Sequence, residues 1–564
     1  MVLFALLAFV PSGGTHGSAI ERQPGSVSVI LLSQPLTPIG KTQLNAILDT
    51  ADLANLRWPD FGKYQAELKK FYNAFNGSLP WTHESRPTSQ AIAVIQRLEN
   101  AENEGLNSED YDGLRWRGRI SALQQPDPAP ESELIHFDVS LTVSAMRFIS
   151  DLHAGRVNPD RSHFVPDIDH ANFDLSEFLQ LQVVNASDPG SVIDAVEPPF
   201  PIYQRTLSAL RTYVDLARRD DGELLPVPHK AIKPGEAYPG LSRLNRLLLL
   251  LGDLAEQEND ISSPTLYQGS LVAAVTHFQQ RHGLEENGLI DAPTVKELNT
   301  PLSQRVTQLR LTLERLRWLP HQFQRPPIVV NIPEFRLRAV DEKYHWTLFM
   351  RVVVGKAYRH QTPVFASDIK SVIFRPYWNV PLSIVRSEVL PHMEKDPAYL
   401  MKNSYEVVDA SGTVVISATV TEVMKRQLRR GKLGIRQTPG PDNALGLLKF
   451  DFPNQHDVYM HGTPAMELFS RSRRDFSHGC IRVEDPVALA AWLLQDQPEW
   501  TADHIRSATL ADTTLRVDLE RPVPVFIVYG TAVTMENGEV HFFRDIYGQD
   551  AVLEQAFLNH IDSE

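Results

Sequence analysis

One cysteine and one histidine are the residues of this sequence best suited to nucleophilic chemistry. Cys480 is the single cysteine among 564 residues, and it lies in the segment Ser-His-Gly-Cys-Ile-Arg that begins at Ser477. His461 precedes it by 19 positions and is followed by Gly462. A nucleophilic thiol needs a base that removes its proton, a group that orients the base, and N–H donors for the oxyanion. The two segments contain residues for all three roles.

The residues around Cys480 suggest how its thiol is activated. The run VEDPVALAAWLL that follows predicts a helix, whose N-terminal N–H groups would lower the pKa of the thiol. Gly479 has no side chain to obstruct a substrate carbonyl near the backbone N–H groups. His461 ends the predicted strand DVYMH, and the carbonyl of Gly462 can hold its second ring nitrogen.

Two other interpretations of these residues stay open at this point. Cys480 can be a buried packing residue among unrelated histidines, as isolated cysteines commonly are. Alternatively, His456, His461, His478 and Cys480 can be zinc ligands. If residues 456–461 form a strand, His456 and His461 point to opposite faces, which weakens the zinc interpretation.

The elements that must position this site fall into three regions. Residues 42–240 predict helices separated by proline-rich breaks, with apolar residues at helical spacing in 133–152. Residues 242–302 predict a small three-helix bundle, with Gly283 as a C-terminal cap and a third helix opening at Asp291.

Residues 326–550 read as strands with a few helices, such as the strand-like run VPVFIVYGTAV. Within them, residues 386–445 look irregular and contain a basic helix-like piece and a Gly/Pro loop. A long insertion of this kind is usually functional, and we expect a lid over the site. The fold class expected is therefore a multi-domain α+β protein with a helical N-terminal scaffold, a three-helix unit and a β-rich domain carrying an inserted capping segment.

Composition narrows the function further. The formal net charge of −14, without a long basic block, argues against nucleic acid as a partner. Residues 1–25 contain an apolar run at 2–10 that is too short to span a bilayer. The run matches the apolar part of a secretory signal, although no Lys or Arg precedes it. We expect export, with the segment either cleaved or retained as a membrane anchor.

The combination of His-Gly and Ser-His-Gly-Cys-Ile-Arg resembles the signature of the L,D-transpeptidase (YkuD-type) catalytic domain, a cysteine-dependent family that acts on peptidoglycan. VVVGKAYRHQTPVF and PYWNVPLSI resemble elements of the same family. The string VTHFQQRHGLEENGLIDAPTVKELN resembles the peptidoglycan-binding domain attached to many cell-wall enzymes. The order of the regions resembles the large Gram-negative L,D-transpeptidases.

The resemblance implies roles for individual residues. Cys480 would be the nucleophile and His461 the general base, oriented by the Gly462 carbonyl. The N–H groups of Gly479 and Cys480 would form much of the oxyanion hole, with Ser477 in support. His478 would either assist at the site or pack beneath the loop, and Arg482 would either steer a substrate carboxylate or tie the loop by a salt bridge. The residues that would floor the substrate groove are Trp378, Asn379 and Tyr459. No cofactor or metal is implied.

The implied reaction is acyl transfer between peptidoglycan stem peptides. Cys480 would attack the diaminopimelate carbonyl of a tetrapeptide stem and release D-Ala, and the amine of a second stem would take the acyl group. A free D-amino acid, water or a lipoprotein would be other acceptors. The implied setting is the periplasm, with other cell-wall enzymes as partners and carbapenems as covalent inhibitors. A zinc- or cysteine-dependent hydrolase or carboxypeptidase and a non-catalytic wall-binding protein are the alternatives.

Overall fold

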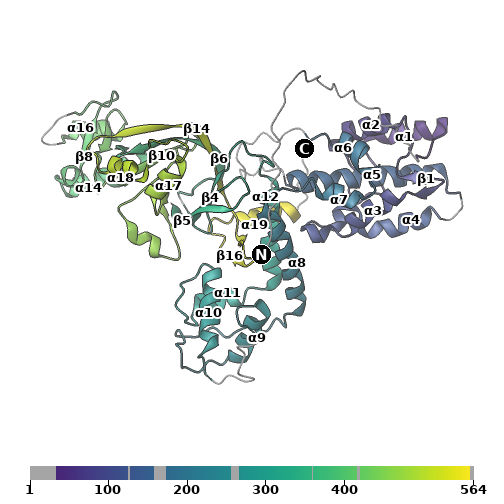
Figure 1. Cartoon of the computed structure of the whole chain (residues 1–564), viewed down its shortest axis with the longest axis horizontal. Helices are drawn as coiled ribbons and strands as arrows, with labels where there is room; N and C mark the ends of the chain where they lie inside the picture. Colours follow the sequence, from purple (N-terminus) through teal and green to yellow (C-terminus); the bar gives the residue numbers. More distant parts are fainter. Residues whose placement is uncertain are drawn as a thin grey trace, which may run out of the picture.

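The computed structural model describes residues 33–124, 128–157, 173–255, 266–358, 360–415 and 420–558. Figure 1 shows an N-terminal helical region, a small helical unit and a β-rich region around a central pair of long helices. The expected export segment at 1–25 lies outside the described residues. Across the described ranges, no helix has both the length and the apolar character needed to cross a bilayer.

The N-terminal helical region packs around one long helix, α5 (Glu131–Ala154), which is buried on most of its faces. A buried polar group is costly unless it is hydrogen-bonded. Accordingly, Asp138 on α5 accepts from the Tyr72 hydroxyl at 2.8 Å and from the Trp81 backbone N–H at 2.9 Å. The expected helical N-terminal region is confirmed. Its other α-helices are α1 (Pro38–Thr50), α2 (Gln65–Ala74), α3 (Ser89–Glu99), α4 (Trp116–Ala122), α6 (Leu175–Phe178) and α7 (Pro189–Asp194).

The central pair consists of α8 (Pro201–Arg219) and α12 (Leu302–Arg317), which share a core with the C-terminal hairpin of β15 (Ala532–Thr534) and β16 (Val540–Phe542). The buried Arg317 guanidinium donates to the Tyr203 hydroxyl at 3.0 Å and to a carbonyl of the N-terminal region. The pair therefore joins the helical regions to the β-rich region (Figure 1).

Three short helices form the small unit: α9 (Leu241–Leu251), α10 (Ser270–Arg281) and α11 (Ala292–Leu298). Leucines of α9 pack against Val275 and Phe278 of α10 in a separate core. Gly283 has a φ of +60° after α10, and the Asp291 side chain caps α11 by accepting from Thr294 N–H at 2.8 Å. Local turn chemistry therefore sets these helix ends, but a helical fold alone does not say what the unit binds.

The β-rich region contains a nine-stranded sheet with the strands in the order β12 (Asp475–Ser477), β5 (Trp346–Gly355), β13 (Ile481–Val483), β11 (Met460–His461), β10 (Leu448–Asp451), β6 (Phe365–Phe374), β14 (Leu515–Val528), β3 (Ile328–Asn331) and β4 (Arg336–Val340). Because β4 also pairs with β5, the sheet closes on itself. Helices α17 (Pro486–Leu493) and α18 (Ala502–Leu510) add apolar side chains to its core. The expected β-rich domain with a few helices is confirmed.

Residues 386–415 and 420–445 form a folded subdomain, so the expectation of an irregular segment is wrong. A second sheet has the order β7 (Trp378–Asn379), β9 (Gly434–Gln437) and β8 (Tyr405–Val408), beside helices α14 (Leu390–Lys395), α15 (Tyr399–Lys402) and α16 (Glu422–Arg429). These elements share a core that includes Leu390, Leu428 and Ile435. The short helices and strands of this subdomain do not show a clear hydrophobic period in the sequence. Only the basic helix α16 was expected from the sequence. We refer to residues 378–445 as the capping subdomain.

Candidate active site

His461 lies on strand β11, and Cys480 directly precedes the neighbouring strand β13 of the main sheet. β11 and β13 pair in parallel with Met460 opposite Ile481 and His461 opposite Arg482, and Ile481 N–H donates to Tyr459 O at 3.1 Å. Met460 and Ile481 are fully buried in the core. Because side chains alternate along a strand, His461 and Arg482 both point to the opposite face. The charge of Arg482 acts on both His461 and Cys480, so the two groups lie on the same side of the strand pair.

His461 is held as a neutral base. Its side chain is 5% exposed, and Nδ1 lies 2.5 Å from the carbonyl oxygen of Gly462. Since a carbonyl can only accept, Nδ1 carries the proton and Nε2 keeps a free lone pair. Burial, followed by the charges of Arg482 and Lys449, lowers the pKa of His461 to about 3. The orienting bond expected from the sequence is present.

The backbone of Gly462 and Thr463 packs so closely against Gly446 that only glycine fits at position 446. Gly446 has a φ of +64°, and a Cβ there would lie 2.6 Å from the backbone nitrogen of Thr463 and 2.7 Å from the carbonyl carbon of Gly462. The Gly/Pro loop at the end of the capping subdomain therefore supports the carbonyl that orients His461.

Cys480 is not at a helix N-terminus, so the expectation of a helix-activated thiolate is wrong. Strand β13 separates Cys480 from α17, whose own N-terminus is capped by Asp485. Burial raises the pKa of the Cys480 thiol, and hydrogen bonding from Tyr459 opposes this only in part. The resting site thus holds a neutral thiol, whose Sγ donates to Asp457 O at 3.8 Å, and a neutral imidazole.

Hydrogen bonds within residues 477–480, which we call the cysteine loop, and one from Thr362 hold this loop in place. Ser477 Oγ donates to Cys480 O at 2.5 Å and accepts from Gly479 N–H at 3.1 Å. Gly479 N–H is therefore not free for an oxyanion in this conformation, which corrects that part of the expected oxyanion hole. Thr362 Oγ1 donates to Gly479 O at 2.8 Å, and Gly479 has a φ of +117° that favours glycine.

His478 faces the capping subdomain. Its Nε2 lies 2.7 Å from Glu388 Oε1, and its ring centre is 4.9 Å from that of His360. Glu388 lies just before α14 and has no motif that marks it in sequence.

The expected groove residues divide into two groups. Burial raises the pKa of Tyr459, and both Cys480 and Trp378 are near enough to act on it; Lys449 Nζ lies 4.4 Å from the Tyr459 ring centre. These side chains belong to the site, and Lys449 is an addition that the sequence does not single out. Asn379 is exposed on β7, opposite Arg436. No hydrogen bond of its side chain to His461 or Cys480 is found among the described residues.

Arg482 shares the face of Cys480 and is near enough to influence its charge. Its Nε is buried without a hydrogen-bond partner, and within the described part of the chain it makes no ion pair. The salt-bridge role considered for Arg482 is therefore absent from this conformation.

The sequence argument against zinc assumed that residues 456–461 form a strand, and most of that strand is absent, so the argument does not hold. Only Met460–His461 is extended, while His456 lies in a turn with its ring centre 5.1 Å from that of Phe365. Over the described ranges, no group of three or more His, Cys, Asp or Glu side chains is arranged to hold a metal ion.

Comparison with known proteins agrees with this geometry. A family model described as the L,D-transpeptidase catalytic domain matches residues 325–527, and one described as a Scaffold domain matches residues 66–210. The match to residues 325–527 agrees with the resemblance found in the sequence. A Haemophilus influenzae protein named "Putative L,D-transpeptidase" is 35% identical over 269 residues, which cover 47% of this chain. The match spans about half the length of that relative, 52%.

Proposed function

We propose that this protein is a peptidoglycan L,D-transpeptidase in which Cys480 is the nucleophile and His461 the general base. One observation carries the proposal: the Gly462 carbonyl binds His461 Nδ1–H, and this leaves Nε2 unprotonated on the face that also presents Cys480. A general base needs this tautomer before the substrate arrives.

In the acylation step, the Cys480 proton moves to His461 Nε2 as the sulfur attacks the carbonyl of diaminopimelate in a tetrapeptide stem. The resulting oxyanion is bound by Cys480 N–H, and Gly479 N–H joins when it leaves Ser477 Oγ. The intermediate collapses to a thioester, and the departing D-Ala amine takes the proton from His461. Because both groups start neutral, proton transfer and attack are coupled.

In the transfer step, the side-chain amine of a second stem's diaminopimelate attacks the thioester. The amine gives its proton to His461, which returns it to the sulfur as the new amide bond forms. The unpartnered Arg482 Nε is suited to a substrate carboxylate, while Trp378 and Tyr459 line the groove beside the sulfur. His478 joins the loop to the capping subdomain, which excludes competing water.

The remaining regions would attach the enzyme to peptidoglycan. We propose that residues 242–302 bind peptidoglycan, that residues 42–240 act as a scaffold, and that the protein works in the periplasm with residues 1–25 as a signal or anchor. Donor and acceptor stems are its partners in this scheme. These proposals rest on the resemblance and on the substrate of the catalytic family.

The test is to incubate the protein with a soluble tetrapeptide stem and to measure D-Ala and cross-linked product by mass spectrometry. Cys480→Ala should abolish both products, whereas His456→Ala, which changes a nearby histidine outside the pair, should retain them. Turnover by Cys480→Ala contradicts the nucleophile assignment.

Three further outcomes separate the alternatives. Tripeptide without cross-link indicates a carboxypeptidase, loss of activity on chelation with recovery on zinc addition indicates a metallohydrolase, and no turnover at all indicates a wall-binding protein. A covalent carbapenem adduct on Cys480, absent in Cys480→Ala, supports the cysteine mechanism.

A further inference from the structure

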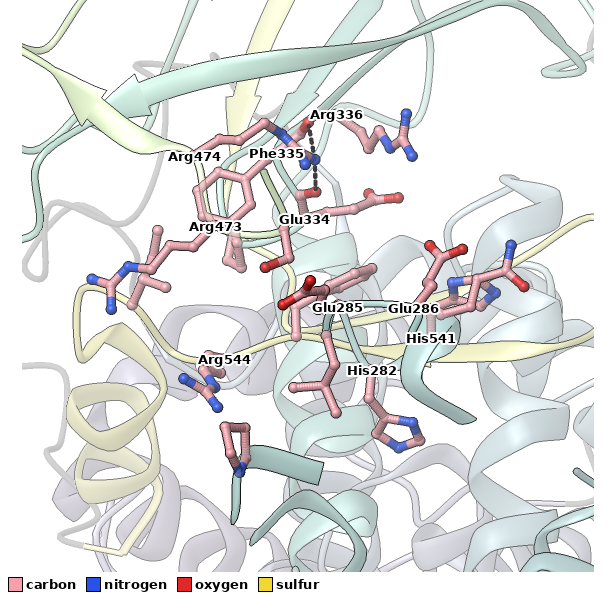
Figure 2. Close-up of a pocket in the computed structure, with 18 of the residues that line it drawn as sticks. His282, Glu285, Glu286, Glu334, Phe335, Arg336, Arg473, Arg474, His541 and Arg544 are labelled. Atoms are coloured by element: carbon pink, nitrogen blue, oxygen red, sulfur yellow. Dashed lines mark hydrogen bonds between the residues drawn. The ribbon is translucent and has the colours of Figure 1, made fainter. Parts of the chain in front are cut away.

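A cavity of about 400 Å³ lies where the small helical unit meets the β-rich region. Its walls come from residues 283–286 after α10, the turn at 333–336 between β3 and β4, residues 472–474 before β12, and the C-terminal segment around 541–546 (Figure 2). This volume is typical of sites for small ligands. The described residues that line it include neither His461 nor Cys480.

Buried contacts hold the walls together. The Arg281 guanidinium donates to the Tyr213 hydroxyl at 3.2 Å and to Val540 O at 3.3 Å. The ring centre of His282 lies 3.7 Å from that of Phe278 and 5.7 Å from that of Phe542. The contacts of Arg281 with Val540 and of His282 with Phe542 cross from the helical unit to the C-terminal hairpin, so the cavity is formed before any ligand binds.

One wall carries two arginines, Arg336 and Arg474, that form no ion pair among the described residues. The charges of Glu334 and Glu484 act on both, but Glu334 is bound by Arg338, with one contact at 2.6 Å. Among the described residues Arg336 makes no ion pair, and Arg474 donates to Phe335 O at 3.2 Å but keeps its Nε buried without a partner. Burial and the charge of Arg336 lower the pKa of Arg474 to about 10, as expected for crowded cations.

The facing wall carries the opposite charge. Glu285 and Glu286 are exposed in the loop after α10, and Figure 2 shows their side chains below those of Glu334, Arg336 and Arg474. Within the described part of the chain neither glutamate has an ion pair. A ligand that satisfies both walls must carry carboxylate and amine groups on one chain.

We propose that this cavity binds a segment of a peptidoglycan stem peptide, with its carboxylates at Arg336 and Arg474 and its free amine at Glu285 and Glu286. The proposal rests on the proposed function, because that function supplies a polymer whose stems bear both groups. It adds a second stem site, separate from the one at Cys480.

The cavity lies close to the cysteine loop, so a stem bound there can affect the reaction at Cys480. Arg474 precedes β12 directly, and the cysteine loop follows the strand at Ser477. At about 3.3 Å per residue, β12 spans roughly 10 Å. A stem held at the start of the strand keeps its own polymer near the thiol, and the effective concentration of neighbouring stems rises.

The experiment measures how many stems bind, without turnover. Full-length Cys480→Ala protein is titrated with a soluble disaccharide-tetrapeptide by calorimetry, and Arg336→Ala or Glu285→Gln with Glu286→Gln is added to that background. Arg506→Ala changes an exposed arginine on α18 and is the matched control. We expect Arg336→Ala to remove one bound stem per chain, the double glutamine variant to weaken that site at least five-fold, and Arg506→Ala to change neither.

Equal stoichiometry and affinity in the Arg336→Ala and Arg506→Ala proteins overturn the proposal. If Arg336→Ala fails to fold by circular dichroism, the double glutamine variant decides, because its exposed loop tolerates the change, and unchanged binding then overturns the proposal. Failure of the proposed function shows separately, as wild-type protein that does not release D-Ala from the same stem.

Discussion

Glu388 Oε1 and His478 Nε2 lie 2.7 Å apart, and this contact joins the capping subdomain to the loop that carries Cys480. Trp378, at the start of this subdomain, also acts on Tyr459 near Cys480. The inserted segment is therefore a subdomain with its own core, and polar substitutions can weaken its contact with the loop of Cys480.

Weakening the hydrogen bond between Glu388 and His478 should increase hydrolysis of the thioester relative to transfer. Glu388→Gln replaces a charge-assisted hydrogen bond with a neutral one, a loss of roughly 1.4 kcal/mol or about ten-fold. We expect the ratio of cross-linked to hydrolysed product to fall by about that factor, because water enters more easily. Glu394→Gln, which changes a carboxylate paired with Arg429 in the same subdomain, is the control and should keep the wild-type ratio. An unchanged ratio in Glu388→Gln contradicts the idea that Glu388 keeps water out by joining the capping subdomain to the cysteine loop.

The ionisation of Cys480 can be followed by alkylation. Because burial raises the pKa of the thiol, the thiolate fraction keeps increasing with pH beyond the range of an ordinary cysteine. The rate of reaction with iodoacetamide should therefore still climb at pH 9, measured beside a free thiol such as glutathione. A plateau below pH 7 would instead indicate a thiolate and imidazolium pair at rest.

His461 should make the fold sensitive to acid. Its pKa falls from 6.5 to about 3 on burial, so below pH 6.5 the unfolded chain binds a proton that the folded chain does not. Stability from this group is complete above pH 6.5 and is lost as pH falls towards 3, by up to roughly 1.4 kcal/mol per pH unit. The melting temperature of His461→Gln should fall less steeply between pH 6.5 and 4 than that of wild type. Parallel slopes for the two proteins would refute the buried neutral base.

Thr362 should position the cysteine loop. Thr362→Val keeps the side-chain volume but removes the hydroxyl that donates to Gly479 O, at a cost of about 1 to 2 kcal/mol. We expect kcat to fall by about ten-fold, with recovery in Thr362→Ser. Thr509→Val removes a buried hydroxyl on α18 that donates to a helix carbonyl and controls for general destabilisation. Equal activity losses in Thr362→Val and Thr509→Val would indicate a purely structural role.

Gly446 should tolerate no side chain. Its positive φ and the 2.6 Å approach of a Cβ to Thr463 N would force the His461-Gly462 segment to move in Gly446→Ala. We expect a destabilisation of at least about 1 to 3 kcal/mol and loss of transpeptidation, read by thermal melting and by D-Ala release. Gly440→Ala, in the same loop, meets nothing within 4 Å and should behave as wild type. A fully active Gly446→Ala protein would contradict this support.

The sequence by itself determined the candidate catalytic pair, His461 and Cys480, and several local elements. The spacing of His461 and Cys480, the glycine after His461, the cap at Asp291 and the basic helix α16 are all legible because each depends on neighbours within a turn or a short motif. The broad division into helical and β-rich regions is likewise carried by hydrophobic periodicity.

Tertiary structure decided the environment of that pair. Strand β13 removes Cys480 from the helix terminus that the sequence placed beside it, and Ser477 Oγ occupies Gly479 N–H. Thr362 and Glu388 reach the cysteine loop from 117 and 90 residues away along the chain. Such contacts depend on which strands pair and on how the capping subdomain folds, and no local sequence pattern predicts them. The protonation state of Cys480 and the contacts that hold its loop are therefore set by the tertiary structure.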